Sequence, residues 1–130
     1  MPKLGLSFAS FLVLGAFLIT QPVLANGRTE GPNGGKWAEA SGYHLELVAA
    51  DGMLTVYVYV GPEEPVASEG GSGSALVLAN KNKAKVTLSP ADENIMTGEG
   101  DFTVADGMKV VVTVNLANGD KLRARFAYGN

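Results

Sequence analysis

After Gly34 the chain consists of short stretches in which apolar and polar residues alternate. Valine, leucine, threonine and tyrosine dominate these stretches, and glycine, asparagine, aspartate and proline interrupt them about every 8 to 12 residues. This pattern predicts an all-β domain, an immunoglobulin-like antiparallel β-sandwich of about 7–8 strands. The predicted strands are Lys36–Ala40, Tyr43–Ala49, Met53–Val60, Ser74–Ala79, Ala84–Ser89, Ile95–Glu99, Lys109–Leu116 and Lys121–Phe126.

The register of the first long hairpin follows from a turn signal and from the faces of its two strands. Asp51-Gly52 indicates a two-residue turn. Pairing around this turn gives one apolar face, with Leu47 opposite Val56, Leu45 opposite Val58 and Tyr43 opposite Val60. The other face pairs Val48 with Thr55, Glu46 with Tyr57 and His44 with Tyr59. Because turn chemistry and burial agree, we expect this register.

The last hairpin presents a conflict between its turn signal and its burial pattern. An Asn-Gly pair at positions 118–119 favours a two-residue turn, but that register sets Val112 opposite Arg125. Burying a charge costs far more than a turn preference gains, so we expect a slip by one residue that leaves the arginines outside. This predicts a three-residue loop or a bulge around Asn118–Asp120. The expected pairs are Leu116 with Leu122, Val114 with Ala124 and Val112 with Phe126.

The N-terminal residues predict export. Lys3 precedes an uncharged apolar run, and "VLA" at positions 23–25 has the small or compact residues of a cleavage site. We therefore expect a signal peptide at 1–25, a flexible segment at 26–34 and the β-domain at 35–130. The alternative is a retained membrane anchor, since about 20 apolar residues suffice to span a bilayer. The first interpretation places the protein in the periplasm or outside the cell, without stable membrane insertion after cleavage.

Composition excludes several classes of function. There is no cysteine, so neither disulfides nor thiolate metal sites are possible. The chain has 10 lysines and arginines against 13 acidic residues, and the acids are scattered along it. We do not expect nucleic acid as a partner, because binding nucleic acid needs a clustered basic face. No serine elbow or cysteine nucleophile is present, so we do not expect an enzyme.

The glycine-rich stretch "GPNGGKW", residues 31–37, resembles a phosphate-binding loop in composition. Such a loop needs a strand before it and a helix after it, because the helix N-terminus supplies free amides and a favourable dipole. Here a strand is predicted to follow. We therefore interpret the stretch as a turn that leads the chain into its first strand.

The candidate site lies on the polar face of the first long hairpin. His44, the only histidine, and Glu46 are two residues apart and so point to the same side of a strand. If Ser41-Gly42 is a tight turn, Glu39 lies beside His44. The predicted patch comprises His44, Glu46, Trp37, Glu39, Tyr57 and Tyr59. The side of the sheet on which Trp37 lies is left open, because a bulge would turn it into the core.

Three interpretations of this patch remain. An imidazole with one or two carboxylates binds divalent metals, which makes His44 and Glu46 candidate ligands for a weak Cu or Zn site; no other cofactor is expected. Aromatic side chains beside carboxylates also bind peptides and sugars. The alternative is an ordinary half-polar strand face, since tyrosine and tryptophan favour strands in any case.

The motifs "GPNGGKW", "YHLELV", "LTVYVYV" and "VTLSPADENIMTGEGDF" within residues 31–102 are similar to the small periplasmic domain of heavy-metal efflux adaptor (membrane fusion) proteins and to related stand-alone bacterial proteins. The resemblance implies metal handling beside an envelope efflux system. The chain departs from those domains at Asn33 and in "FTVADG", where the adaptors tend to carry histidines.

We therefore expect an exported, non-enzymatic binding or accessory module, associated with heavy-metal (copper-type) efflux and with a protein partner in that system. The alternative is a structural or protein-interaction domain with no metal role.

Overall fold

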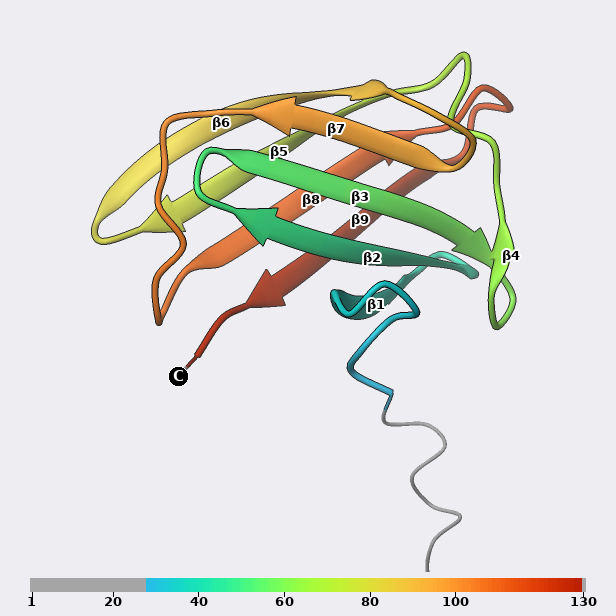
Figure 1. Cartoon of the computed structure of the whole chain (residues 1–130). Coiled ribbons are helices and arrows are strands. Elements are labelled where there is room, and N and C mark those ends of the chain that lie inside the picture. The colour runs from blue at the N-terminus through green and yellow to red at the C-terminus, as the bar shows by residue number, and fades with distance from the viewer. Residues whose placement is uncertain (1–27, 130) are drawn as a thin grey trace, which may run out of the picture.

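The computed structural model describes residues 28–129, which form an all-β domain without helices (Figure 1). The predicted signal peptide at 1–25 lies outside the described residues. The strands are β1 (Lys36–Ala40), β2 (Tyr43–Ala50), β3 (Met53–Val60), β4 (Glu64–Pro65), β5 (Ser72–Ala79), β6 (Asn82–Pro90), β7 (Ile95–Glu99), β8 (Lys109–Asn115) and β9 (Lys121–Ala127). All the predicted strands are found; the two-residue β4 was not predicted.

All strand pairs are antiparallel and belong to one 9-stranded sheet with the order β1-β2-β3-β7-β6-β5-β8-β9, and β4 pairs with β3. The all-β, antiparallel class is confirmed. The immunoglobulin-like sandwich is not confirmed, because the sheet curls into a nearly barrel-shaped body instead of separating into two sheets. Strand β6 joins the two halves: most of it pairs with β5, but Ser89 and Pro90 pair with β7.

The two ends of the strand order meet across the remaining gap, where β1 contacts β9 without ladder hydrogen bonds. The Lys36 ammonium lies 4.9 Å from the centre of the Tyr128 ring, just beyond β9. The Tyr43 hydroxyl donates a hydrogen bond of 2.6 Å to the Asp120 carboxylate, before β9. Side chains therefore hold this seam closed at both of its ends.

The first hairpins have the predicted register. Ser41 and Gly42 both have positive φ, 52° and 85°, as a type I′ turn between β1 and β2 requires. Leu45 pairs with Val58 and faces the interior, and Glu46 pairs with Tyr57 on the other side. Trp37 pairs with Glu46, so it lies on the outer face and not in the core.

The last hairpin confirms the expected faces but not the expected pairs. Arg123 and Arg125 are exposed and Phe126 is buried, as predicted. However, Val112 pairs with Ala124, and Phe126 pairs with Val110. The predicted pairing of Val112 with Phe126 is therefore wrong by two residues.

The physical reason is the position of the loop. The Gly119 N–H donates to the Leu116 carbonyl at 2.9 Å, and the Leu116 N–H donates to the Asp120 carbonyl at 2.8 Å. This is a three-residue loop, Ala117–Gly119, in which Gly119 takes the left-handed position with φ 96°. The type of loop was predicted, but it begins one residue earlier than expected, and each residue of displacement shifts the pairing by two.

Aliphatic side chains from both halves of the sheet fill the core. Leu45, Leu54 and Val56 meet Val86, Val110 and Val112 there, all with no exposed surface. Inward positions alternate with outward ones along every long strand, which is why the strands could be recognised from the sequence.

Candidate functional site

The glycine-rich stretch does bind an anion, and the anion is the chain's own Glu46. Residues 28–35 fold back over the outer face of β2 and β3. The Oε2 atom of Glu46 accepts hydrogen bonds from the N–H groups of Asn33 at 2.8 Å and Gly35 at 2.7 Å. The Oε1 atom accepts one from the Asn33 side-chain amide at 2.9 Å. Glu46 has no exposed surface, so the loop and the carboxylate form a closed internal site.

Two glycines make this close approach possible. A Cβ atom on Gly31 would overlap the carboxyl carbon of Glu46, and a Cβ on Gly35 would lie 2.5 Å from the Leu47 carbonyl oxygen. The chain needs glycine at these positions because any side chain would displace the loop from the sheet. Sequence reasoning interpreted these glycines as a turn and missed the carboxylate they enclose. The sequence feature that could have indicated this site is a glutamate on a strand that follows a glycine-rich loop, whose main-chain N–H groups are accessible as donors.

Tyr59 completes the buried cluster. Its hydroxyl accepts a hydrogen bond from the Asn33 amide at 3.1 Å and lies 3.5 Å from Oε1 of Glu46. Burial, and then the nearby Glu46 charge, raise the pKa of Tyr59 above its usual value of 10.0. The neutral phenol is therefore the form that fits beside the carboxylate.

His44 and Trp37 lie against each other at the edge of this cluster. Their ring centres are 4.8 Å apart and nearly parallel, and the Arg28 guanidinium lies 4.1 Å from the Trp37 ring centre. Arg28 also forms an ion pair of 2.8 Å with Glu63, which ties the entering chain to the loop after β3. The Trp37 ring is thus already contacted by side chains of the domain itself.

The histidine ring has a defined hydrogen on one nitrogen. Its Nδ1 atom lies 2.8 Å from the Gly61 carbonyl oxygen, which can only accept a hydrogen bond. In the neutral ring Nδ1 therefore carries the hydrogen, and Nε2 keeps the lone pair that a metal would bind.

The structure brings the predicted patch together but changes what its carboxylates can do. Glu46 lies on the same face as His44, yet both of its oxygens accept hydrogen bonds from the glycine-rich loop and Asn33. Glu39 pairs directly with His44 and is exposed, and Tyr57 is half-buried opposite Glu46. Within residues 28–129, no group of three or more histidine, cysteine, aspartate or glutamate side chains could hold a metal ion. The metal site stays a prediction.

A second feature, which the sequence did not suggest, is a basic face on the outer side of β6, β5, β8 and β9. Cross-strand pairs show which residues share this side: Leu78 pairs with both Lys83 and Lys109, and Val111 pairs with Arg125. Side chains of paired residues project to the same face. The cations of the basic face are Lys83, Lys85, Lys109, Lys121, Arg123 and Arg125, all exposed.

No acidic residue occurs on these four strands. The one ion pair within residues 28–129 joins Arg28 to Glu63, and neither residue belongs to these four strands. Within that range, therefore, no cation of the basic face forms an ion pair with a carboxylate. Between the cations of β6 and those of β9 runs an aliphatic stripe of Leu76, Leu78 and Val111, of which Leu78 is 37% exposed. The protein is acidic overall, but its fold separates the charges.

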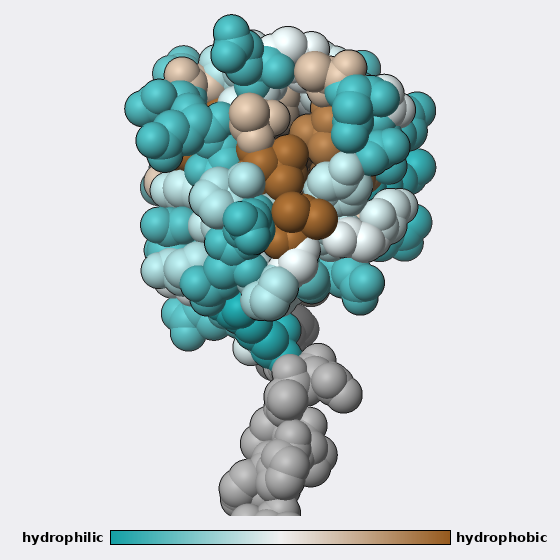
Figure 2. Space-filling model, turned by 90° about the vertical axis from the view of Figure 1, so that its right-hand side faces the viewer, coloured by the Kyte–Doolittle hydropathy of each residue, from teal (hydrophilic) through white to brown (hydrophobic). Residues whose placement is uncertain are grey.

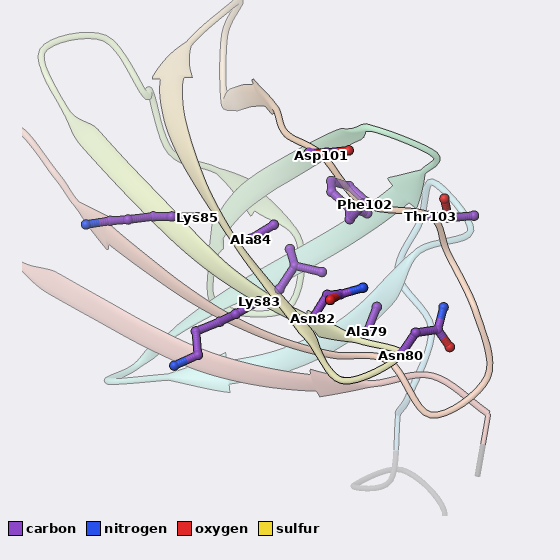
Figure 3. Close-up of a pocket in the computed structure, with 10 residues that line it drawn as sticks. Ala79, Asn80, Asn82, Lys83, Ala84, Lys85, Asp101, Phe102 and Thr103 are labelled. Carbon is purple, nitrogen blue, oxygen red and sulfur yellow. The ribbon is translucent and has the colours of Figure 1, made fainter.

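A groove opens beside the basic face, where β6 diverges from β7 (Figure 3). Val77, Ala79, Ala84 and Phe102 supply apolar surface, and Asn80, Asp101 and Thr103 lie around it. In Figure 3 the side chains of Lys83 and Lys85 run outward to the basic face, whereas Ala84 and Phe102 point toward each other.

Two further features lie outside the patch and the basic face. On the face that Figure 2 shows, apolar atoms lie in a hollow framed by hydrophilic ones. Val60, the last residue of β3, is 39% exposed. Single exposed apolar residues are common on soluble domains. Just after the C-terminal end of β9, the Tyr128 hydroxyl is buried without a hydrogen-bond partner in residues 28–129. Burial raises the pKa of Tyr128 to about 12.

Comparison with known proteins adds no relative. No protein-family model, no curated protein and no solved structure matches this chain. The resemblance to efflux adaptor domains therefore stays a prediction. Within residues 28–129, no helix is long and apolar enough to cross a membrane.

Proposed function

We propose that this chain is an exported, non-enzymatic binding module that attaches to anionic lipid surfaces of the cell envelope through its basic face. The observation that carries the proposal is the collection of Lys83, Lys85, Lys109, Lys121, Arg123 and Arg125 on one side of four strands that contain no acidic residue. Export is supported by the signal-peptide pattern at 1–25.

The dimensions of the face suit a layer of headgroups. Cations two apart on a strand lie about 7 Å from each other, and β6 and β9 are separated by three strand spacings, about 14 Å. Each lysine or arginine close to an anionic bilayer contributes about 1 kcal/mol of attraction. Several such contacts together support reversible binding without insertion.

The aliphatic stripe favours lipid over nucleic acid. Leu76, Leu78 and Val111 lie between the two sets of cations, where they can contact the apolar part of the headgroup region. Binding of single-stranded nucleic acid uses aromatic side chains on which bases stack. The strands of the basic face carry no aromatic side chain on their outer side, since Phe126 points into the core. Because the fold gathers these cations on one face, the scattered charge of the sequence does not by itself disfavour nucleic acid; the lack of outer aromatic side chains on these four strands does.

Sedimentation with vesicles tests the proposal. The mature protein should bind vesicles of phosphatidylglycerol and phosphatidylcholine, and not vesicles of phosphatidylcholine alone. Binding should weaken as salt is added, because screening shortens the reach of exposed charges. The double variant Arg123→Gln, Arg125→Gln should bind about 30-fold more weakly, from about 1 kcal/mol per cation.

Lys36→Gln is the matched control, since Lys36 is a cation on β1 beside Tyr128 and outside the basic face. It should bind vesicles like the unmodified protein. Equal losses in the control and the double variant would contradict the proposal. Tighter binding to an oligothymidylate than to the anionic vesicles at the same salt concentration would replace lipid by nucleic acid.

The role beside a metal-efflux system, with a protein partner there, stays a prediction of the resemblance. Its specific support in the structure is the Nε2 lone pair of His44, which the hydrogen bond at Nδ1 leaves available in the neutral ring.

A further inference from the structure

Strand β6 has an edge that is only partly paired. Its residues Asn82–Leu88 pair with β5 on one side, and on the other side only Ser89 and Pro90 pair with β7. The groove of Figure 3 follows the unpaired part, and Asn82, Lys83, Ala84 and Lys85 all line it. An open length of strand beside an apolar groove provides both main-chain and side-chain contacts for an added strand.

The turn before β6 decides which main-chain groups face the groove. Asn80 and Lys81 both have positive φ, 51° and 66°, which defines a two-residue type I′ turn. In such a hairpin the pair next to the turn, Ala79 with Asn82, exchanges hydrogen bonds, and every second pair beyond it does the same. Asn82 and Ala84 therefore bond to β5, while Lys83 and Lys85 direct their N–H and C=O groups to the open edge.

A contact further along β6 supports this assignment. A Cβ atom on Gly98 of β7 would overlap the main-chain carbonyl oxygen of Thr87, so this oxygen points away from β5 and toward β7. Thr87 lies two residues from Lys85 and four from Lys83, so the main-chain groups of all three residues point to the same edge of β6. The outward groups of Thr87 are covered by β7, whereas within residues 28–129 those of Lys83 and Lys85 have no main-chain hydrogen-bond partner.

We infer that this edge binds an extended segment of a partner protein, as an added antiparallel or parallel strand with alternating acidic and apolar residues. The outward side chains of that strand would lie beside Lys83 and Lys85, where opposite charges attract across strands. Its inward side chains would enter the groove beside Ala84 and Phe102, which requires apolar groups.

A second copy of this chain is a poor occupant of the same edge. Antiparallel pairing of two β6 strands about Ala84 would set Lys83 of one opposite Lys85 of the other. Like charges directly opposite each other destabilise a strand pair, and edge lysines prevent self-association in many sheet proteins. The edge is therefore selective for a strand of opposite charge.

Amide hydrogen exchange measured by NMR tests this inference with a defined probe, a short capped peptide in which valine and glutamate alternate. At a peptide concentration about ten times Kd, exchange at Lys83 and Lys85 should slow about tenfold. Ala84 should change little, because its amide already bonds to β5. Protection that does not alternate in this way, or that appears on other strands, would overturn the inference.

Two controls separate strand addition from simple charge attraction. A peptide with the same side chains, N-methylated on the amides that would bond to β6, should lose binding; equal binding of this peptide would overturn the inference. In the variant Lys83→Glu, Lys85→Glu, the preference should reverse toward a peptide of alternating valine and lysine. The outcome is independent of the lipid proposal, because no vesicle is present and the lipid test contains no peptide.

Discussion

The carboxylate of Glu46 accepts a hydrogen bond of 2.7 Å from the main-chain N–H of Gly35, the residue that immediately precedes β1. This contact fastens the entering chain onto the outer face of the sheet, because Glu46 belongs to the neighbouring strand β2. A buried carboxylate must have its lone pairs satisfied, and the glycine-rich loop provides the donors. We therefore consider Glu46 a structural residue of this domain.

Removing the charge of Glu46 should destabilise the fold. In Glu46→Gln one acceptor oxygen becomes a donor, so at least one of the amides of Asn33 and Gly35 or the Asn33 side chain loses its partner. Each donor left buried and unsatisfied costs about 1–3 kcal/mol of unfolding free energy. Urea denaturation measures the loss. Glu39→Gln, on the same face but exposed, should stay within about 0.5 kcal/mol, and equal losses would contradict a structural role for Glu46.

Substitutions at the last hairpin test its faces and its register. Phe126→Ala should cost about 3–5 kcal/mol, as truncation of a buried aromatic does, and Arg125→Ala should change stability by less than about 0.5 kcal/mol. A double-mutant cycle then distinguishes the two registers. Phe126 should couple to its partner Val110 by at least about 0.5 kcal/mol, and more strongly than to Val112. The reverse order would restore the pairing expected from the sequence.

Tyr128 should make the domain sensitive to alkali. Burial raises its pKa from 10.0 to about 12, so the folded chain retains a proton that the unfolded chain releases. Stability is therefore unaffected below pH 10 and decreases as the pH rises from 10 toward about 12. Tyr128→Phe should reduce this decrease, measured by thermal unfolding across that pH range. Tyr59 adds a contribution of the same sign, so some decrease should remain.

The same variant has an expected effect at neutral pH. The Tyr128 hydroxyl is buried without a partner in the described part of the chain, so replacing it by hydrogen removes an unsatisfied polar group. Tyr128→Phe should be neutral or stabilising by about 1 kcal/mol. A large loss of stability would show that the hydroxyl has a partner.

Metal binding at the candidate patch should depend on His44. A site built from one imidazole and the exposed Glu39 beside it would be weak and would prefer Cu(II) to Zn(II). Calorimetric titration of the mature protein and of His44→Ala measures this. An unchanged heat signal in the variant, or no signal with either metal, would leave the patch without a metal role.

Much of the fold could be predicted because inside and outside positions alternate along each strand. The bounds of β1, β3 and β7 agree with the pattern, and the register of β2 against β3 follows from Asp51-Gly52 together with the apolar face. The last hairpin shows where this reasoning ends. Slips of one residue in either direction keep Arg125 outside and Phe126 inside, so burial cannot choose between them. The choice depends on where Gly119 takes its left-handed conformation.

The sequence alone therefore determined the β-class, the strands and their buried faces, because these depend on local alternation and turn residues. The tertiary structure decided the environment of Glu46, which is buried because residues 28–35 return over its strand. It also decided the basic face, because Lys83 and Arg125 are far apart in the chain and share a surface only through β5 and β8. Both features arise from long-range pairing, and no local pattern of residues encodes which strands become neighbours.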